Sequence, residues 1–342
     1  MNCCCECFSS AYLKDIINRN DKSGDCDFCK SKGINIYDPR ELYLIFQNIL
    51  YSVSDKGRPI EELIEEDFPE RIFTKRVKQK SKELLQEIVG DDFISYKELF
   101  ENNVENVTNQ SQAAKPFEIT WEKLADEIKN TNRFHLQNVL DLDKLKILLR
   151  RYKKPINKGK IYYRARLSGA DGFTKGLMGN PPSKDARAGR ANPVGISYLY
   201  LSDQEITTLY ETRASLYDYI TIGVFRLKED IEVINLRGNT YDPILLAESE
   251  ELEDFLIYRP FTSKLEEQLS KPKRRSDNEL DYLPTQYLSE FIKSISFSGV
   301  EFQSSLFAEG YNLAIFDPSK FECIKAKVYE IKKIDILHEP IP

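Results

Sequence analysis

The spacing of apolar residues changes near Pro155. Before it, apolar side chains recur three and four positions apart, which is the period of an amphipathic helix. This spacing predicts helices at 41–52, 73–89, 120–130 and 141–154. After it, short runs rich in Tyr, Ile, Val and Phe are typical of strands. They predict strands at 160–167, 195–201, 219–227, 231–236, 299–305, 312–317 and 325–337.

Helical spacing returns between the strands, at 203–214, 244–257 and 284–295. We therefore expect an α+β fold, with a mixed α/β domain over 155–342 that follows a helical domain over 41–154. The polar segment 102–116 is expected to be a loop. Asp141 is a plausible N-cap for the helix after it.

One helix, at 203–214, carries an isolated acid. Ser202 precedes Glu205 by three positions, which predicts a capping box at the start of this helix. Three apolar residues then have the spacing of a core-facing stripe: Ile206, Leu209 and Tyr210. Glu211 lies on an adjacent face, where its carboxylate is either solvated or directed into a cleft; from the helix alone we expect it to be solvated.

The first forty residues follow neither pattern and hold six of the seven cysteines. Two Cys-x-x-Cys pairs, Cys4 with Cys7 and Cys26 with Cys29, are separated by eighteen residues. Each pair can direct two thiolates at one tetrahedral zinc ion, and the spacing is typical of zinc sites. We expect a zinc-binding module over 1–40, in which the structural Zn²⁺ contributes folding free energy. Cys3 and Cys5 stay open as substitutes in the first pair, and reduced thiols without metal are the alternative.

Charge and hydropathy narrow the class of protein. The net charge of −6 does not favour nucleic acid or an anionic membrane as a partner. No apolar run approaches the roughly 18–20 residues that span a bilayer. The N-terminus lacks the basic-then-apolar pattern of a signal peptide. We therefore expect a soluble, cytoplasmic protein, in which the basic stretch 270–279 is a solvated loop.

Several arginines and other polar residues lie in a strand that is expected to be buried or in a long loop, and they are candidates for ligand binding. Arg164 and Arg166 share one face of a strand destined for burial, and a buried arginine requires an anion. The segment 176–195 is a long loop rich in Gly and Pro, a length typical of functional loops. With Glu211 and the serines that end the strand 299–305, these groups suit a small anionic ligand that carries a ribose or a ring.

The order of "YYRAR", "GRANPVGISYLYL", "TTLYETRA" and "GVEFQSS…GYNLAIFDP" resembles the RES domain over about residues 160–320. The cysteine-rich, helical front resembles the HEPN-like region found with a subset of RES domains, where Cys7-Phe8 and Cys26 to Cys29 match. The resemblance implies a fold related to ADP-ribosyltransferase toxins. It also implies NAD⁺ as the substrate, cleaved at the nicotinamide–ribose bond by hydrolysis or phosphorolysis, and a toxin-like enzyme restrained by an antitoxin or regulatory partner.

The resemblance further implies catalytic roles for three residues. The family's arginine, glutamate and serine correspond to Arg164, Glu211 and Ser304, and the adjacent Ser305 leaves the choice of serine open. A carboxylate such as Glu211 can hold the ribose hydroxyls and stabilise the positive charge that develops as the bond breaks. The hydroxyl of Ser304 can hydrogen-bond the ribose or the carboxamide.

A second set of residues is implied to bind the dinucleotide. Arg190 and Tyr200 match family positions that line the NAD pocket, and we place Asn192 and Ser305 with them. Arg190 and Arg164 can bind the pyrophosphate through paired N–H groups, and Tyr200 offers a face for nicotinamide stacking.

Two other functions stay open. The same fold could transfer ADP-ribose to a macromolecule, or the chain could be a non-catalytic zinc-and-helix interaction module. A HEPN-type ribonuclease is disfavoured, because Arg133 precedes His135 by only two residues where that motif needs a longer gap. The sequence does not indicate the oligomeric state.

Overall fold

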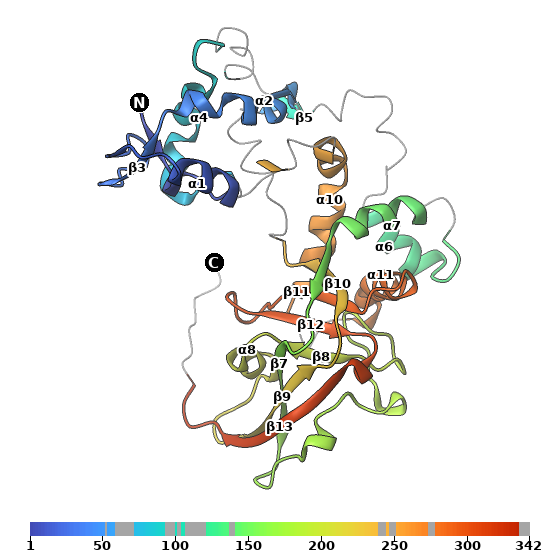
Figure 1. Ribbon diagram of the computed structural model, residues 1–342. Helices are drawn as coiled ribbons and strands as arrows, with labels where there is room; N and C mark the ends of the chain where they lie inside the picture. The colour runs from blue at the N-terminus through green and yellow to red at the C-terminus, as the bar shows by residue number, and fades with distance from the viewer. Residues whose placement is uncertain are drawn as a thin grey trace, which may run out of the picture. The chain divides into compact units, whose positions relative to one another are not determined.

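Residue contacts divide the chain into two compact units (Figure 1). The first comprises Met1–Glu118 and Tyr241–Pro260, and the second comprises Ile119–Thr240 and Phe261–Pro342. This computed structural model describes residues 1–51, 53–58, 72–92, 100, 104–106, 121–136, 141–238, 244–245, 251–272 and 278–334. Residues 246–250 of the predicted helix 244–257, and 273–277 of the basic stretch, lie outside that description.

The contact-based units differ from the expected division at Pro155. The helices predicted at 120–130 and 141–154 lie in the second unit, with the long strands. The helical pattern shows which face of a segment packs, but not which core it packs against. Separation of the front part into a zinc-binding module over 1–40 and a helical HEPN-like domain stays a prediction.

Among its described residues, the first unit combines three complete α-helices and the first half of α10 (Glu251–Ser270) with two small sheets. The helices are α1 (Ala11–Asn18), α2 (Tyr43–Tyr51) and α4 (Ser81–Val89). The strands β1 (Cys3–Cys4), β3 (Ile34–Tyr37) and β2 (Ser23–Gly24) pair in that order. The second sheet pairs β4 (Val53–Arg58) with β5 (Val104–Asn106), so the described part of the predicted loop 102–116 is a strand. The 3-10 turns are η1 (Cys5–Cys7), η2 (Pro39–Leu42), η3 (Lys75–Lys80) and η4 (Gly90–Asp92).

One hydrophobic core serves the cysteine-rich segment and the helices of the first unit. The ring centroid of Phe8 lies 6.3 Å from that of Phe46 and 5.9 Å from that of Phe73. Phe8 also forms a β-bridge with Phe73. Buried cysteines join this core beside Leu13 and other apolar side chains of the first fifty residues. The first forty residues, which look poor in core-forming residues, therefore gain burial from segments that follow them.

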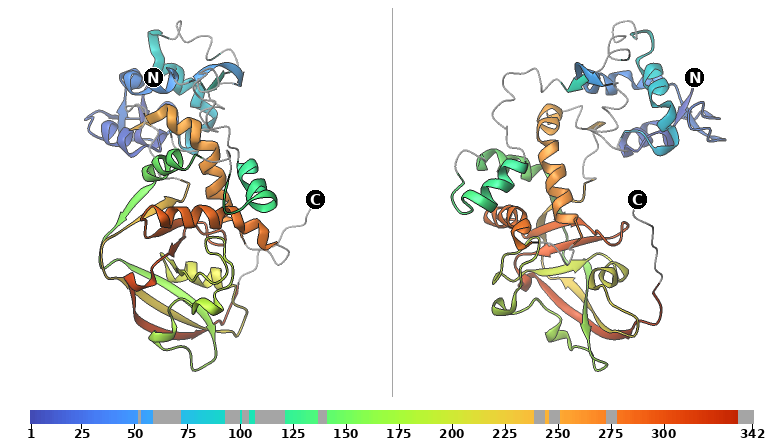
Figure 2. Two further views of the ribbon diagram at one scale, coloured as in Figure 1. Left: turned by 90° about the vertical axis from the view of Figure 1, so that its right-hand side faces the viewer. Right: turned by 180° about the vertical axis from the view of Figure 1, so that it is seen from behind.

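The second unit holds an eight-stranded sheet and several helices. Its helices are α6 (Trp121–Asp126) with the π-helical turn η7 (Glu127–Thr131), α7 (Leu142–Arg151), α8 (Glu205–Thr212), α10 (Glu251–Ser270, from Phe261 on) and α11 (Leu283–Ser294). The 3-10 turns are η8 (Lys175–Leu177), η9 (Ser183–Asp185), η10 (Glu279–Tyr282) and η11 (Pro318–Lys320). The two views of Figure 2 show α6 beside α11, and the two helices are in contact.

The sheet has the strand order β13-β9-β7-β8-β12-β11-β10-β6. Its strands are β6 (Lys153–Ile156), β7 (Ile161–Ser168), β8 (Leu199–Ser202), β9 (Tyr219–Leu227), β10 (Ile231–Leu236), β11 (Gly299–Gln303), β12 (Tyr311–Ile315) and β13 (Phe321–Glu330). Only β10 and β11 run parallel. Strands β7 and β8 share a single residue pair, Tyr163 with Ser202, so the sheet opens between them.

Local capping was predicted correctly for α7 and incorrectly for α8. The Asp141 carboxylate accepts the backbone N–H groups of residues 143 and 144, which confirms it as an N-cap. Helix α8 instead starts at Glu205 without a side-chain cap, because Ser202 still belongs to β8. The predicted capping box is therefore wrong. The hydroxyl of Ser202 bonds across the sheet instead.

The apolar stripe predicted for α8 is also wrong. Ile206 and Tyr210 are 41% and 49% exposed, whereas Thr207 and Thr208 are buried. Gly310 lies so close to Thr207 that a Cβ atom at Gly310 would clash with it. This close approach turns the threonine face of α8 toward the neighbouring loop, and the aliphatic and aromatic residues are left at the surface.

A buried acid, Glu301 on β11, stabilises the sheet of the second unit. Its carboxylate is fully buried and accepts hydrogen bonds from Lys154 at 2.7 and 3.0 Å and from Arg237 at 3.4 Å. We expect Glu301→Gln to destabilise the protein by about 3 kcal/mol, near the lower end for breaking a buried ion pair, because both cations are partly exposed and stay partly solvated. Urea unfolding of the full chain measures the difference.

Glu322→Gln is the matched control for this prediction. Glu322 pairs with Arg226 at 2.8 Å, but both side chains are about half exposed. Exposed ion pairs contribute roughly 0–1 kcal/mol, so this variant should unfold within about 1 kcal/mol of the parent. Equal destabilisation by the two substitutions would contradict a special role for burial at Glu301.

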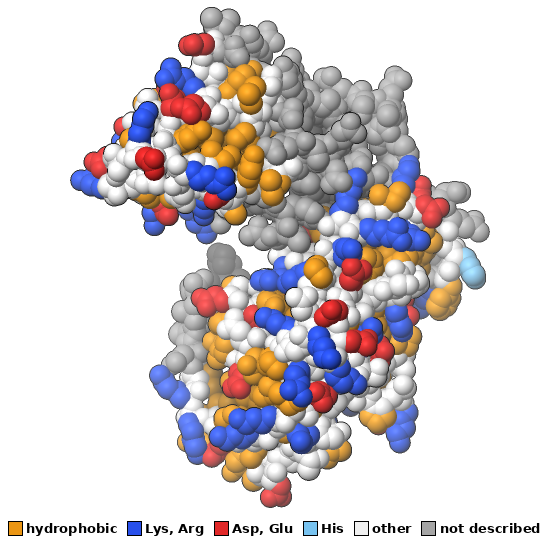
Figure 3. Space-filling view, in the orientation of Figure 1, with side chains coloured by type: hydrophobic (Ala, Val, Ile, Leu, Met, Phe, Trp, Pro, Cys, Tyr) orange, Lys and Arg blue, Asp and Glu red, His pale blue; other side chains and the backbone are white. Residues whose placement is uncertain are grey.

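The surface of the second unit mixes charges of both signs. Figure 3 shows lysine, arginine and acidic side chains interspersed on one face of this unit, as on a solvated surface. Within the described part of the chain, no helix combines the length and apolar character needed to cross a membrane.

Candidate functional site

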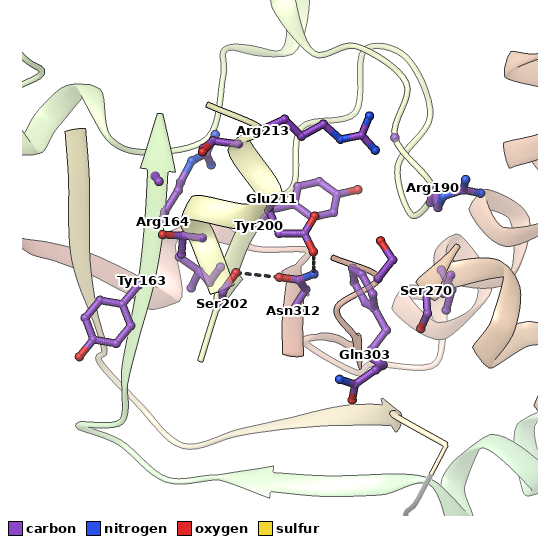
Figure 4. Close-up of a pocket in the computed structure, with 18 of the residues that line it drawn as sticks. Tyr163, Arg164, Arg190, Tyr200, Ser202, Glu211, Arg213, Ser270, Gln303 and Asn312 are labelled. Carbon is purple, nitrogen blue, oxygen red and sulfur yellow. Dashed lines mark hydrogen bonds between the residues drawn. The ribbon is translucent and has the colours of Figure 1, made fainter. Parts of the chain in front are cut away.

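A pocket of about 520 Å³ lies in the second unit, where the sheet opens between β7 and β8. Its walls come from β7, β8, β11, β12, α8, the Gly189–Arg190 loop and the segment that ends α10. Among the predicted site residues, the structure brings five to its walls: Arg164, Arg190, Tyr200, Glu211 and Ser305. Figure 4 shows most of them around one cavity.

Glu211 is exposed to the pocket, but its carboxylate is not simply solvated. Its Oε1 atom accepts hydrogen bonds from the hydroxyl of Ser304 at 2.7 Å and from the amide Nδ2 of Asn312 at 2.8 Å. Two donors on one oxygen fix the orientation of the carboxylate. Glu211 is therefore an exposed acid directed into a cleft, the alternative that the helix pattern left open, and its hydrogen-bond partners come from distant segments.

The two serines after β11 occupy different positions. Ser304 is buried, and its Oγ also accepts the backbone N–H of Phe307 at 3.2 Å, which holds the turn after the strand. Ser305 is exposed and lies on the wall of the pocket. Ser304 is thus the serine that contacts Glu211, whereas Ser305 can contact a ligand directly.

Sequence reasoning missed Asn312 and Ser202. Asn312 lies on β12, opposite Ser202 on β8, and the Ser202 hydroxyl donates to Oδ1 of Asn312 at 2.7 Å. Both side chains are largely buried and line the pocket. A signal was available in "YNLAIF", where a single amide interrupts a strand that is otherwise apolar.

Arg164 provides a half-buried positive charge at the same pocket. Burial lowers the pKa of its guanidinium to about 10, and the neighbouring Arg166 adds to this effect. Among the described residues, its buried Nη1 atom has no hydrogen-bond partner. Arg166 is engaged differently, because it donates to the carbonyl of Leu177 and lies over the ring of Phe173. A half-buried cation with a buried, unused donor is a ready site for an anionic group.

Asn192 braces the loop behind the pocket. Its Nδ2 lies within hydrogen-bond distance of the carbonyls of Arg187, Pro193 and Ile196, at 2.9–3.1 Å. Its Oδ1 accepts the hydroxyl of Tyr200 at 2.7 Å. Burial raises the pKa of Tyr200, so this phenol stays protonated as a donor. Asn192 thus holds Tyr200 and is not itself on the pocket wall, which leaves direct NAD binding by Asn192 a prediction.

Arg190 lies on the pocket wall and binds the segment at the end of α10, which is not part of the sheet. Its guanidinium donates to the carbonyl of Gln268 at 3.3 Å and to that of Pro272 at 3.0 Å, and lies 4.8 Å from the ring centroid of Tyr282. The carbonyl of Arg190 accepts the hydroxyl of Thr285 at 2.6 Å. Arg190 therefore fixes the segment after α10 at the edge of the pocket, and pyrophosphate binding by Arg190 stays a prediction.

The charges of the pocket wall are strongly unequal. Among its lining residues, a single carboxylate, that of Glu211, faces four cationic side chains: Arg164, Arg190, Arg213 and Lys271. Arg213 ends α8 with a left-handed backbone, φ 50°. This excess of positive charge favours a ligand with more than one negative charge.

A separate group of four thiols lies in the first unit. The sulfur atoms of Cys4, Cys7, Cys26 and Cys29 all lie within 4.8 Å of one another, as the two Cys-x-x-Cys pairs predicted. Three measured separations are 3.4, 3.4 and 4.0 Å. Tetrahedral zinc with Zn–S bonds of ~2.3 Å places its sulfurs ~3.8 Å apart, so this group could hold a metal ion. Cys3 lies outside the group, and its thiol contacts the carbonyl of Tyr37.

All residues that line the pocket lie in the part of the chain that matches one known protein family. The family model described as "RES domain" matches residues 161–335, just over half of the chain, which contains every lining residue of the pocket. The HEPN-like character of the front part stays a prediction. No curated protein matches the chain. Among solved structures, a chain from the crystal structure of the M. tuberculosis MbcT-MbcA toxin-antitoxin complex is 13% identical, with a TM-score of 0.32; the alignment covers 56% of this chain and 94% of that chain.

Proposed function

The chain belongs to the RES domain family, and from the pocket within that domain we propose that it consumes NAD⁺ by cleaving the nicotinamide–ribose bond. The observation that carries the proposal is the Glu211 carboxylate, held by Ser304 and Asn312 in a pocket that is otherwise cationic. NAD⁺ carries a dianionic pyrophosphate and a ribose whose anomeric carbon becomes positively charged as the bond breaks. The pocket supplies complementary charges for both.

The proposed reaction is a heterolytic cleavage. The electron pair of the C1′–N bond leaves with the ring nitrogen, so that neutral nicotinamide departs and an oxocarbenium-like ribose remains. Glu211 stabilises this cation, as carboxylates do in glycoside chemistry. Water, which then loses a proton, or phosphate captures the cation to give ADP-ribose or its 1″-phosphate. The unused donor of Arg164 suits the pyrophosphate or the phosphate acceptor.

The cellular setting belongs to the same proposal. Removal of a central cofactor harms a cell, so a toxin-like role restrained by an antitoxin or regulatory partner fits the activity. A structural zinc ion in the four-thiol group fits a cytoplasmic location, where thiols stay reduced. We also propose that the RES domain has a fold like that of ADP-ribosyltransferases. The front part, which we expect to be HEPN-like, would regulate the enzyme.

NAD⁺ turnover by the purified full chain tests this function. We expect loss of NAD⁺ with equimolar release of nicotinamide. Chromatography of reactions run with and without phosphate measures both compounds and identifies the second product. Free ADP-ribose indicates hydrolysis, a phosphorylated ADP-ribose that needs added phosphate indicates phosphorolysis, and ADP-ribose attached to protein or nucleic acid indicates transfer. Intact NAD⁺ in every condition, with and without phosphate, would refute the proposal.

A further inference from the structure

Four polar side chains, three of them on the pocket wall, form a continuous hydrogen-bond chain. The hydroxyl of Ser202 donates to Asn312, Asn312 donates to Glu211, and Ser304 donates to the same carboxylate oxygen. The three distances are 2.7, 2.8 and 2.7 Å. Figure 4 shows Ser202, Asn312 and Glu211 joined in this order from β8, β12 and α8. Ser202, Asn312 and Ser304 are each less than 9% exposed.

The chemistry of these groups dictates which way the amide of Asn312 faces. An ionised carboxylate only accepts hydrogen bonds, so Asn312 must present its NH₂ group to Glu211. Its carbonyl oxygen then faces Ser202, and the Ser202 hydroxyl must be the donor. In the flipped orientation, the amide oxygen would lie against the carboxylate, and two acceptors would repel each other.

We propose that Ser202 is a positioning residue that locks the amide of Asn312 in the orientation that holds Glu211. The Glu211 carboxylate excludes the flipped orientation, and Ser202 stabilises the correct one by donating a hydrogen bond to the buried Oδ1 of Asn312. The pairing of Ser202 with Asn312 in the register of β8 and β12 makes this geometry a property of the sheet. The kinetic form of the proposal rests on the proposed function, because its readout is NAD⁺ consumption.

A competing role for Ser202 is direct contact with the ligand. Ser202 also lies on the pocket wall, next to Tyr163 in the pairing of β7 with β8. A residue that acts only through Asn312 loses its effect once Asn312 is removed, whereas a residue that touches the ligand keeps it. A double-mutant cycle therefore separates the two roles.

The cycle compares kcat and KM for NAD⁺ in the full chain, in Ser202→Ala, in Asn312→Ala and in the double variant. Loss of a hydrogen bond to a charged group predicts a fall of about 10- to 100-fold in kcat for Asn312→Ala. Ser202→Ala should lower kcat by about 3- to 10-fold, the size of a neutral hydrogen bond, with little change in KM. In the Asn312→Ala background, the same substitution should change kcat by less than about twofold.

Ser168→Ala is the matched control for the cycle. Ser168 lies at the far end of β7, accepts a hydrogen bond from Thr221 at 2.9 Å, and is not a lining residue of the pocket. It should reproduce any general effect of a lost strand hydroxyl, but not the fall in kcat. An equal effect of Ser202→Ala with and without Asn312 would overturn the proposal.

A measurement without NAD⁺ keeps the proposal testable if the parent protein proves inactive. The side-chain NH₂ signals of Asn312, identified by their absence in Asn312→Asp, can be followed by NMR hydrogen exchange. We expect slow exchange in the parent and at least about tenfold faster exchange in Ser202→Ala, because the amide then loses the hydrogen bond that holds its Oδ1. Unchanged protection in Ser202→Ala would overturn the role of Ser202. Inactivity of the parent alone would refute only the proposed function.

Discussion

Glu211→Gln should lower kcat for NAD⁺ consumption by about 10²–10³-fold or more, the range seen when one preorganised electrostatic group is removed from a reaction centre. The substitution keeps the shape of the side chain but removes the negative charge that would stabilise the ribose cation. It also places an amide opposite the donors Ser304 and Asn312. Nicotinamide release at saturating NAD⁺, measured with the full chain, gives the difference.

Glu205→Gln is the matched control, because it makes the same chemical change on the same helix. Glu205 is exposed in the first turn of α8 and does not line the pocket. The activity of Glu205→Gln should stay within about twofold of the parent, and this variant should melt within a few degrees of it, since surface changes cost about 0.5 kcal/mol. Full activity in Glu211→Gln would remove Glu211 from the mechanism.

Cys26→Ser should abolish stoichiometric zinc binding and unfold the first unit. Cys26 lies 3.4 Å from the sulfur of Cys7, within the group of four thiols, and its Sγ accepts the backbone N–H of Cys29. Structural zinc contributes about 10–16 kcal/mol in small zinc-binding peptides, far more than the total stability of a typical domain. Metal analysis by mass spectrometry and thermal unfolding of the full chain measure the two effects.

Cys3→Ser and Cys323→Ser are the controls for the zinc site. Cys3 neighbours a proposed ligand in sequence but lies outside the four-thiol group, and Cys323 lies on β13 of the second unit. Both variants should retain zinc. Loss of zinc from Cys3→Ser would show that Cys3 is a ligand, and retention of zinc by Cys26→Ser would show that the metal assignment is wrong.

Chemistry that depends on neighbours in the chain could be predicted from the sequence. The two Cys-x-x-Cys turns each bring their own pair of thiols together, so the spacing indicated a four-thiol group, and the structure selected Cys4 and Cys7 where Cys3 and Cys5 had stayed open. Asp141 caps α7 through the next two or three residues, which is also a local relation. The RES motifs, which are read along the chain, indicated a resemblance over about residues 160–320, and the family model matches 161–335.

Relations between distant segments were decided only by the tertiary structure. Glu211 receives its two hydrogen bonds from residues 93 and 101 positions away, and whether they meet depends on the register of β11 and β12. The helix pattern of α8 predicted a buried apolar stripe, but the close approach of Gly310 turned the threonine face inward. Periodicity identifies the faces of an element, whereas its neighbours in space decide which face is buried.

The sequence by itself thus determined which residue types are present to do chemistry, and which local turns, caps and thiol pairs they form. The tertiary structure decided which of these groups meet. It joined Ser202, Asn312, Glu211 and Ser304 into one chain, and it engaged Arg190 with the carbonyls after α10. The physical reason is that hydrogen bonds are short and directional, so they depend on strand register and packing that no local pattern specifies.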